Sequence, residues 1–167
     1  FISRDRFGIK PFYYFVDDER FIFASEIPAI LSVLKYKPRA NNQAIFDYLV
    51  FNRTDQTEMT FFEGVKKLQH GHNILIDLNE NSVNTININR WYNLDEKVKQ
   101  AKPFTGPNEF RECLVSAIGF RLRSDVPLGV CLSGGLDSSS ITSIIINNYN
   151  KKDLKTFSAI YGQGLKG

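Results

Sequence analysis

Seven consecutive residues have the types and order needed to bind a phosphate group. Adjacent glycines let the backbone approach an anion closely, because no Cβ atom stands in the way. Serine hydroxyls and the first N–H groups of a helix can donate hydrogen bonds to phosphate oxygens. The sequence therefore predicts a phosphate-binding turn built from Ser133, Gly134, Gly135, Leu136, Asp137, Ser138 and Ser139.

Asp137 is the residue of this run that does not suit an anion site by itself. A carboxylate beside phosphates repels them unless a divalent cation lies between the two, so a magnesium ion is expected at Asp137. No Gly-Lys-Ser or Gly-Lys-Thr follows the glycines, so no lysine is placed to reach a γ-phosphate. The alternative interpretation is structural, with a Gly-Gly turn followed by Asp and Ser side chains that cap a helix.

The elements around this turn would place it at the edge of a parallel sheet. Strands are predicted over residues 128–132 and 156–161, with a helix over residues 138–149 between them. This β-α-β order implies parallel strands joined by a right-handed crossover. Ligands of such sheets bind beyond the C-terminal ends of the strands, so a nucleotide is expected between residues 133–139 and the segment after residue 158.

The first part of the chain predicts a β-rich region covered on both faces. Strands over residues 10–16 and 20–24 flank an acidic turn and carry apolar residues on both faces, which is typical of a sheet between two layers. Ser25 is expected to cap a helix that continues to about residue 34. A second helix is predicted over residues 42–51, with an apolar stripe made of Ile45, Tyr48 and Leu49.

A second β region is predicted over residues 61–91. It contains strands over residues 65–68 and 73–78, a turn at residues 79–81, and a return strand that carries Val83, Ile86 and Ile88. The alternation of apolar residues in the second strand and the turn that follows it predict a hairpin.

A domain boundary is predicted at residues 93–107, which are polar, contain two prolines and a glycine, and lack sustained periodicity. Asn108 is expected to cap the next helix, which continues to about residue 124. One face of that helix carries apolar residues.

The composition favours a globular protein of a reducing compartment. The chain has 167 residues, of which 43% are hydrophobic, and a net charge of +3 with scattered basic residues, which argues against a nucleic-acid-binding stripe. Cys113 and Cys131 lack the CxxC spacing of a metal or redox site, so we expect reduced thiols and a cytosolic location. No apolar run approaches the roughly 18 residues of a membrane span, and a soluble protein is expected.

Both ends of the chain lie within predicted structural segments. It begins at Phe1, without a methionine, in a predicted strand, and it stops at Gly167 in a glycine-rich loop. We therefore expect an interior part of a longer protein.

Two segments resemble the glutamine-hydrolysing asparagine synthetases. Residues 133–139 are similar to the PP-loop of ATP pyrophosphatases, and residues 124–132, Ser-Asp-Val-Pro-Leu-Gly-Val-Cys-Leu, lead into it as in that family. Residues 4–14, Arg-Asp-Arg-Phe-Gly-Ile-Lys-Pro-Phe-Tyr-Tyr, and residues 23–27, Phe-Ala-Ser-Glu-Ile, resemble the later part of the family's glutaminase domain. The two segments stand in the family's order.

The resemblance implies a mixed α/β and α+β fold. Residues 1–92 would form the C-terminal portion of a class II glutamine amidotransferase domain, an Ntn-type sandwich. Residues 93–107 would be a linker. Residues 108–167 would begin a synthetase domain with the first β-α-β unit of a PP-loop parallel sheet, of the adenine nucleotide α-hydrolase-like type.

The resemblance also implies an activity. The family makes asparagine from aspartate, with ammonia released from glutamine, and splits ATP into AMP and pyrophosphate. The implied small-molecule partners are glutamine, aspartate and ATP, with Mg²⁺ as cofactor and a cytoplasmic location. Neither nucleic acid nor a membrane is expected as a partner, and a homodimer is compatible with the resemblance.

The site residues implied by the resemblance lie around the glycine turn. Residues 133–139 would hold the pyrophosphate, Mg²⁺ would bridge it to Asp137, and Cys131 and Ala159 would contact adenine and ribose at the strand ends, largely through their backbone. The Cys131 side chain itself is expected to be a small buried hydrophobe. No residue is assigned as catalytic, because the family's nucleophilic cysteine is absent from this chain, and the 167-residue piece is expected to be inactive alone.

Other chemistry-bearing residues are interpreted as structural. The charged residues Arg4, Asp5, Arg6 and Lys10 are expected to brace the fold rather than contact substrate, and Glu26 is interpreted in the same way. His70 and His72 lack the further ligands that a metal site needs, so they are interpreted as turn histidines. The glycines at 162, 164 and 167 match a dinucleotide-binding pattern only formally, and we interpret them as a loop.

Three alternatives stay open. A relative with the same two modules could amidate another carboxylate, as in aminosugar or β-lactam biosynthesis. Another ATP pyrophosphatase, such as a GMP or NAD synthetase or a tRNA-thiolating enzyme, would lack the segment over residues 4–14. A non-catalytic binding protein would not need an intact glycine turn.

Overall fold

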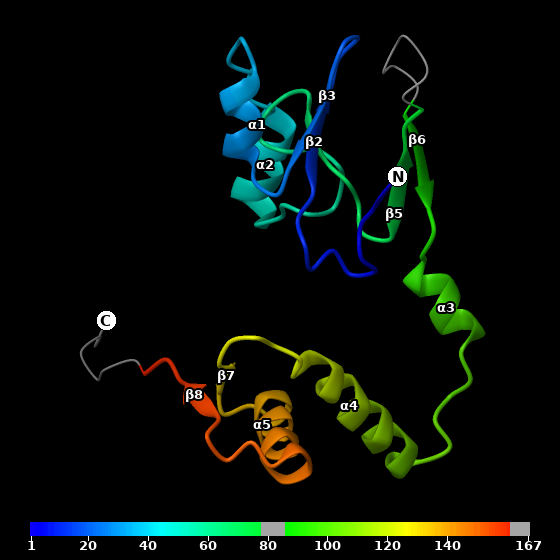
Figure 1. Ribbon diagram of the computed structural model, residues 1–167, viewed down its shortest axis with the longest axis vertical. Coiled ribbons are helices and arrows are strands. Elements are labelled where there is room, and N and C mark those ends of the chain that lie inside the picture. The colour runs from blue at the N-terminus through cyan, green and yellow to red at the C-terminus, as the bar shows by residue number, and fades with distance from the viewer. Residues whose placement is uncertain (78–85, 161–167) are drawn as a thin grey trace. The chain divides into compact units, whose positions relative to one another are not determined.

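The computed structural model describes residues 1–77 and 86–160 (Figure 1). The chain divides into two compact units, Phe1–Ala101 and Lys102–Gly167. The predicted turn at residues 79–81, its neighbour Val83 and the glycine pattern after residue 161 lie outside the described residues.

The first unit contains two antiparallel sheets. One has the strand order β1 (Ile2–Ser3), β5 (His72–Leu75) and β6 (Asn87–Arg90), and the other has the order β3 (Phe21–Ala24), β2 (Tyr13–Val16) and β4 (Val65–Lys67). The predicted hairpin of β2 and β3 is confirmed. Its turn is closed by the Asp17 carboxylate, which accepts hydrogen bonds from the backbone N–H groups of Glu19 and Arg20 at 3.1 and 2.8 Å.

Strand β2 has a hydrophobic layer on each face, as its sequence predicts. Phe15 packs with Ile30 of helix α1 (Ile27–Val33), whereas its neighbour Tyr14 packs with Ile74 of β5. Adjacent strand residues point to opposite faces, so β2 joins the two clusters. The order of layers is therefore helix, sheet β3-β2-β4, sheet β1-β5-β6, which can be followed from left to right in the upper part of Figure 1.

Helix α1 begins one residue later than predicted. Its N-cap is Glu26, in an extended conformation and without a side-chain cap hydrogen bond, so the expected Ser25 cap is wrong. Pro28 lies in the first turn, where its missing N–H group needs no partner within the helix. The proline thus favours helix initiation without the serine cap that the sequence suggested.

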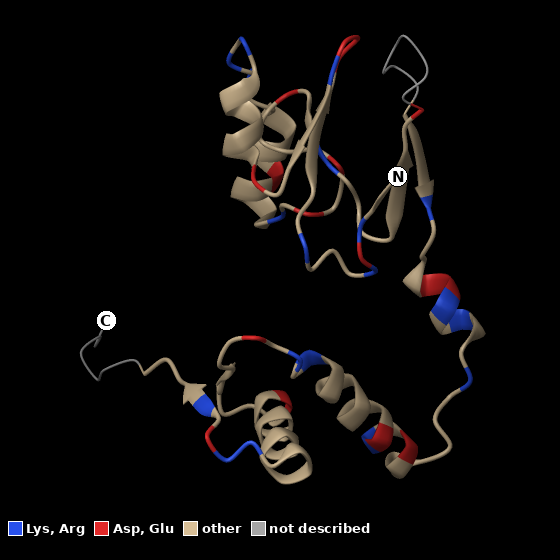
Figure 2. Ribbon diagram, in the orientation of Figure 1, with Lys and Arg blue, Asp and Glu red and all other residues tan. Residues whose placement is uncertain are grey.

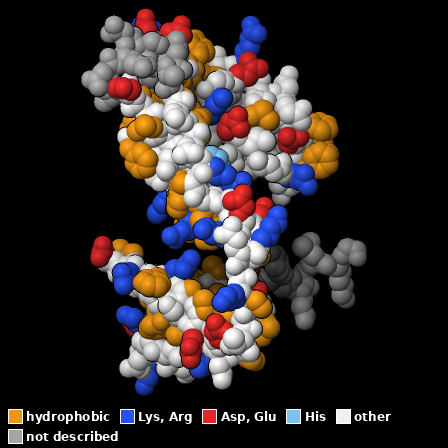
Figure 3. Space-filling model, turned by 90° about the vertical axis from the view of Figure 1, so that its right-hand side faces the viewer, with side chains coloured by type: hydrophobic (Ala, Val, Ile, Leu, Met, Phe, Trp, Pro, Cys, Tyr) orange, Lys and Arg blue, Asp and Glu red, His pale blue; other side chains and the backbone are white. Residues whose placement is uncertain are grey.

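Helix α2 (Asn42–Phe51) has the predicted bounds, and the Asn41 side chain caps it through the Ala44 N–H group at 3.2 Å. Its apolar residues, however, are largely exposed, and Leu49 is 75% accessible. Hydrophobic side chains (orange) are also exposed on the face drawn in Figure 3, which is turned away from this helix. The other exposed apolar residues of this helix are Phe46, Tyr48, Val50 and Phe51.

The predicted linker contains a short helix, α3 (Leu94–Gln100), capped by the Asn93 side chain. Acidic residues lie in its first turn and lysines in its last, as Figure 2 shows along the ribbon. This arrangement complements the helix dipole and stabilises a helix that lacks an apolar stripe. The division between the compact units follows it, at Ala101 and Lys102.

The second unit contains helices α4 (Pro107–Arg121) and α5 (Leu136–Tyr149) and the strands β7 (Gly129–Cys131) and β8 (Lys155–Phe157). Helix α4 begins at Pro107 with Gly106 as its N-cap, so the predicted cap at Asn108 is wrong. Proline at the first helical position already has a suitable φ angle, which explains the earlier start.

A hydrogen bond from Tyr149 connects helices α4 and α5. The Tyr149 hydroxyl donates a hydrogen bond to the Val115 carbonyl at 2.7 Å. Gly119 makes room for this ring, because a Cβ atom at position 119 would overlap the tyrosine hydroxyl. Each helix also has one buried isoleucine, Ile118 in α4 and Ile145 in α5.

Within the described ranges, none of the helices combines the length and the apolar character needed to cross a membrane.

Candidate functional site

The glycine turn connects β7 to α5 in the second unit. Strands β7 and β8 pair in parallel, with Gly129 opposite Lys155 and Cys131 opposite Phe157. The predicted β-α-β order is therefore present, with α5 between the two strands along the chain. A Cβ atom at position 129 would lie 2.6 Å from the exposed Phe157 ring, so a larger residue there would have to displace that ring.

The C-terminal ends of the two strands are held side by side beyond the regular pairing. The Leu132 N–H group donates to the Phe157 carbonyl at 2.8 Å, and the Ser158 hydroxyl donates to the Leu132 carbonyl at 2.6 Å. Cys131 and Ala159 stand next to this joint, one on each strand end. The geometry thus brings the two strand-end positions singled out from the sequence to the same edge.

The turn itself needs glycine at one position. Gly134 has φ of +82°, a conformation that residues with a side chain rarely adopt, and a Cβ atom there would meet no atom within 4 Å. Gly135 is the N-cap of α5. The first N–H groups of a helix have no carbonyl partner within it, so the first turn of α5 offers donors beside an open backbone.

The hydroxyls of Ser133 and Ser138 meet across the turn. Their oxygens lie 3.2 Å apart, and the Ser138 oxygen also accepts from the Ser133 N–H group at 3.3 Å. The Ser133 oxygen lies 3.4 Å from the Gly135 nitrogen. The Ser138 hydroxyl also donates to the Gly135 carbonyl at 3.2 Å, so both hydroxyls bond within the glycine turn.

Asp137 lies in the first turn of α5 and is exposed, as are Leu136 and Ser139. Magnesium ions in proteins are commonly held by one or two carboxylates together with substrate phosphates. One exposed carboxylate beside a row of backbone donors fits that pattern. The described residues contain no cluster of three or more His, Cys, Asp or Glu side chains that could hold a metal without such a substrate.

The burial expected for the Cys131 side chain is wrong. Cys131 is exposed, as is Cys113 of α4. In the described part of the second unit, β7 pairs only with β8, so no further strand or layer covers the cysteine. The prediction assumed a complete central strand, which a two-stranded sheet does not provide.

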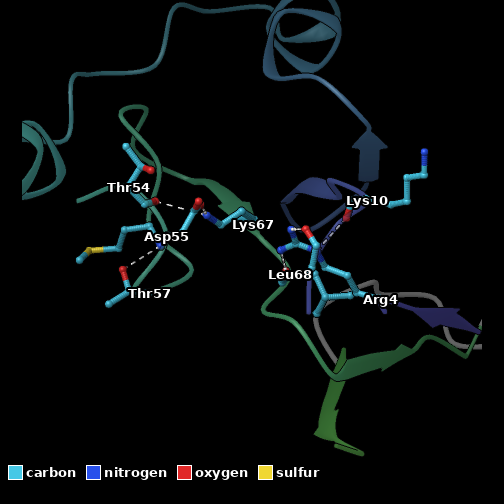
Figure 4. Close-up of polar contacts among 9 residues, drawn as sticks. Arg4, Lys10, Thr54, Asp55, Thr57, Lys67 and Leu68 are labelled. Atoms are coloured by element: carbon cyan, nitrogen blue, oxygen red, sulfur yellow. Dashed lines mark hydrogen bonds and ion pairs between the residues drawn. The ribbon is translucent and has the colours of Figure 1, made fainter. Parts of the chain in front are cut away.

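In the first unit, charged side chains of residues 4–10 bind the backbone. The Arg4 guanidinium donates to the carbonyls of Lys10 at 3.0 Å, Gly8 at 2.9 Å and Leu68 (Figure 4). Burial lowers the pKa of Arg4, and the Asp5 charge acts in the opposite direction. These contacts favour the structural interpretation of the segment.

The Asp5 carboxylate binds backbone N–H groups of the same loop. Its carboxylate accepts hydrogen bonds from the N–H groups of Phe7, Ile9 and Lys10 at 3.0–3.1 Å. Burial would raise the pKa of Asp5, but the backbone N–H groups, that of Lys10 foremost, outweigh it and hold the pKa below its ordinary value of 3.8. The loop is therefore stabilised by the ionised carboxylate.

The remaining residues singled out from the sequence lie apart from one another. Arg6 lies over the rings of Trp91 and Tyr92, at 5.9 and 5.7 Å from their centroids. His70 is exposed in a turn, and its carbonyl oxygen lies 2.9 Å from the Nδ1 atom of His72 in β5. The Arg6 contacts join the N-terminal segment to the residues after β6, whereas the His70–His72 contact is local.

The sequence analysis missed one polar site in the first unit. Lys67 of β4 has a buried side chain whose ammonium group pairs with Asp55. A signal was present, because the two-residue period of a strand places Lys67 on the same face as the buried Val65. The acidic partner could not be predicted, since it lies in an irregular loop.

Comparison with protein families gives two matches. The family described as glutamine amidotransferase domain matches residues 1–92, and the family described as asparagine synthase matches residues 109–166. The first match covers more than half of the chain.

Several relatives are similar to most of the chain. The chain is 33% identical over 170 residues to asparagine synthetase [glutamine-hydrolyzing] 3 of Bacillus subtilis, covering 99% of this chain and 27% of the relative. It is 33% identical to asparagine synthetase [glutamine-hydrolyzing] 2 of the same organism, covering 96% and 22%. It is 35% identical over 147 residues to amidase chry2 of Gibberella zeae, covering 86% and 21%. The chain thus spans less than a third of the length of these relatives.

Proposed function

The chain belongs to the glutamine amidotransferase family of glutamine-hydrolysing asparagine synthetases, and from that premise we propose that it carries parts of two catalytic modules. Residues 1–92 would be the later portion of a class II glutamine amidotransferase domain. Residues 93–107 would connect it to the synthetase domain, which begins at residue 108. The complete protein would make asparagine from aspartate in the cytoplasm.

Architecture supports this division. The first unit has a helix, sheet, sheet order of layers, which suits part of an Ntn-type sandwich. The second unit has a parallel strand pair with a helix between the strands in sequence, which suits the first β-α-β unit of a PP-loop sheet. The two matched families divide the chain in the same order.

The proposed reaction begins with ATP and an acceptor carboxylate. The carboxylate oxygen would attack the α-phosphorus, pyrophosphate would leave, and ammonia from glutamine would then displace AMP from the acyl adenylate. The acceptor gains an amide, and the products are asparagine, AMP, pyrophosphate and glutamate. Residues 133–139 would bind the departing pyrophosphate, whose charge grows as the bond breaks.

The residues of the turn have separate roles in this proposal. Backbone N–H groups at the start of α5 and the Ser133 and Ser138 hydroxyls would donate hydrogen bonds to the pyrophosphate oxygens. Asp137 would hold Mg²⁺, which when bound neutralises part of the phosphate charge. Cys131 and Ala159, at the strand ends, would contact adenine and ribose.

One observation carries the proposal for the second unit. The open, positive-φ glycine turn stands at the end of a parallel strand and immediately before a helix. Backbone amides in this arrangement are preset for an anion, so little reorganisation is needed when charge develops.

An ATP–pyrophosphate exchange assay on the complete protein tests the function. Exchange of labelled pyrophosphate into ATP is expected with aspartate, since adenylation precedes the arrival of ammonia. Exchange that depends on a different acid would change the acceptor. No exchange with any acid, in a folded protein, would favour a non-catalytic relative.

We also propose to test a second acceptor class, because one relative carries a different name. The Gibberella zeae relative is named an amidase rather than an asparagine synthetase, although it is 35% identical over 86% of this chain. The exchange assay therefore includes aminosugar-type and β-lactam-type carboxylate acceptors beside aspartate.

A further inference from the structure

A cavity of about 260 Å³ lies in the first unit, between β2, α2 and the loop that leads from α2 to β4. Its lining includes the apolar side chains of Tyr13, Ile27 and Phe61. It also includes charged side chains of both signs, from Asp47, Arg53 and Lys67, and Lys67 is the cross-strand neighbour of Tyr13. The glycine turn, and the function proposed for it, make no use of this cavity.

Lys67 is the most buried of these charges. Its side chain is 6% exposed, and its ammonium group contacts the Asp55 carboxylate and the Thr54 carbonyl, the latter at 3.3 Å (Figure 4). An ammonium group removed from water is costly unless an anion and further acceptors replace the solvent. Burial and the nearby Arg4 charge lower the pKa of Lys67 accordingly.

The anion that meets Lys67 comes from the surface. Asp55 is 78% exposed, in contrast to its partner. A lysine fixed in a strand is thus paired with a carboxylate that reaches it from a loop open to water. The buried Lys67 ammonium needs a negative charge beside it. The exposed Asp55 carboxylate, in contrast, gives up little free energy when it leaves the lysine for water.

The loop is anchored at both ends and held at its tip by the lysine. At one end, the Arg53 N–H group donates to the Asp47 carbonyl at 3.3 Å. At the other, the Lys67 N–H group donates to the Glu58 carbonyl at 2.8 Å, and Met59 bridges to Lys66. Between these anchors, Thr54 and Asp55 contact the Lys67 ammonium. The tip can therefore leave without opening the strand pairing.

We propose that Lys67 is the anchor of a binding site for small monocarboxylates, and that Asp55 occupies this site from within the chain. A carboxylate ligand would take the place of the Asp55 side chain on the Lys67 ammonium and would extend its apolar part along Tyr13 and Phe61. This inference goes beyond the proposed synthesis of asparagine and does not depend on it.

The charges of the cavity favour a single carboxylate over a phosphate or a dicarboxylate. Lys67 and Arg53 supply two positive charges, and Asp47 stays as a negative charge when Asp55 leaves. The Arg53 guanidinium also lies over the Phe51 ring, 5.4 Å from its centroid. The lining therefore carries one net positive charge once Asp55 has left, and a single carboxylate neutralises it.

The test is a ligand-detected NMR titration of the complete protein with sodium propionate, and with propionamide as the uncharged probe. Asp55→Asn removes the internal competitor and is expected to tighten propionate binding about five-fold, as expected for loss of an exposed ion pair. Lys67→Met keeps the length and apolar stem of the side chain and is expected to abolish binding. Propionamide is expected not to bind.

The neighbouring ion pair supplies matched controls. Lys66 and Glu58 lie 3.9 Å apart, and both side chains are about half exposed. Lys66→Met and Glu58→Gln are expected to leave propionate binding unchanged. Because Lys67→Met could disturb the core, the comparison of Asp55→Asn with Glu58→Gln decides the matter in folded proteins. Equal affinity in those two variants, or equal binding of propionate and propionamide, would overturn the proposal.

Discussion

The two units of the chain differ in where their buried residues lie. Among the described residues, the buried hydrophobic side chains of the first unit span two sheets and a helix, whereas in the second unit only Ile118 and Ile145 reach that degree of burial. The polar groups differ in the same way. Arg4 and Asp5 bind the backbone around them, while Ser133, Ser138 and Asp137 lie at an open turn.

This difference separates stability from ligand binding. In the first unit, side chains with special chemistry satisfy the fold, so changing them is expected to alter the free energy of unfolding. In the second unit, the serine hydroxyls bond within the turn and Asp137 is exposed, so changing them is expected to affect the proposed ligand binding more than the fold. Substitutions in the first unit are therefore expected to change stability, and substitutions in the second unit are expected to change activity.

The largest effect is expected at Asp137. In the complete protein, Asp137→Ala is expected to lower the rate of ATP-dependent synthesis by roughly 1000-fold or more. The reason is that the Mg²⁺ proposed to neutralise the pyrophosphate would lose its carboxylate ligand. Glutamine hydrolysis is expected to continue. Asparagine and glutamate formation are measured together, with Asp153→Ala, another exposed acid of the same unit, as the matched control. Loss of both activities in Asp137→Ala would contradict the separation of the two functions.

The next largest effect concerns the core of the first unit. Ile74 is fully buried on β5, whereas its neighbour Leu75 is 57% exposed. Ile74→Ala is expected to lower the free energy of unfolding by about 3 kcal/mol, and Leu75→Ala by less than about 1 kcal/mol. Urea denaturation measures both. Similar losses in the two variants would mean that the second face of β5 is also covered.

Two glycines with positive φ angles compare the units directly. Gly71 has φ of +65°, and a Cβ atom there would lie 2.7 Å from the Tyr92 carbonyl oxygen, whereas Gly134 has φ of +82° and open space around it. Gly71→Ala combines strain with overlap and is expected to cost about 2 kcal/mol, and Gly134→Ala about 1 kcal/mol. Thermal unfolding of both variants tests this order, and the reverse order would contradict it.

The smallest effect is the pH dependence set by Asp5. Its pKa is held below the ordinary 3.8, so the ionised carboxylate stabilises the fold at neutral pH, and this stabilisation is lost as the pH falls below about 3.8 through the lower folded-state pKa. Asp5→Asn is expected to be less stable at pH 7 and to show a shallower loss on acidification. Unfolding is followed by circular dichroism from pH 7 to pH 2.

A control at neutral pH accompanies that titration. Asp18→Asn makes the same change on the exposed β2–β3 turn and is expected to alter the unfolding free energy at pH 7 by less than about 0.5 kcal/mol. An Asp5→Asn variant as stable as wild type at pH 7 would mean that the hydrogen bonds to this carboxylate contribute little.

Local patterns in the sequence were sufficient for several elements. The bounds of α2, the β2–β3 hairpin and the parallel pair around the glycine turn each depend on residues close together in the chain. Caps were less predictable. Pro28 and Pro107 set the starts of α1 and α4, although Ser25 and Asn108 had the side chains preferred for capping.

Tertiary contacts account for what the sequence did not reveal. The exposure of Cys131 depends on how many strands flank β7, and the exposed apolar face of α2 depends on what packs against it. The pairing of Lys67 with Asp55 joins a strand to an irregular loop, so no periodicity connects them. In the candidate site, the residue types over 133–139 predicted the turn. The contact between the Ser133 and Ser138 hydroxyls could not be predicted, because it depends on the path of the backbone through the turn.

The absence of a side chain at Gly119 limits which residues this position can accept. The Tyr149 ring occupies the space that a side chain at position 119 would fill, and its hydroxyl satisfies the Val115 carbonyl. An alanine at position 119 would therefore displace the Tyr149 ring and leave the Val115 carbonyl in need of a new donor.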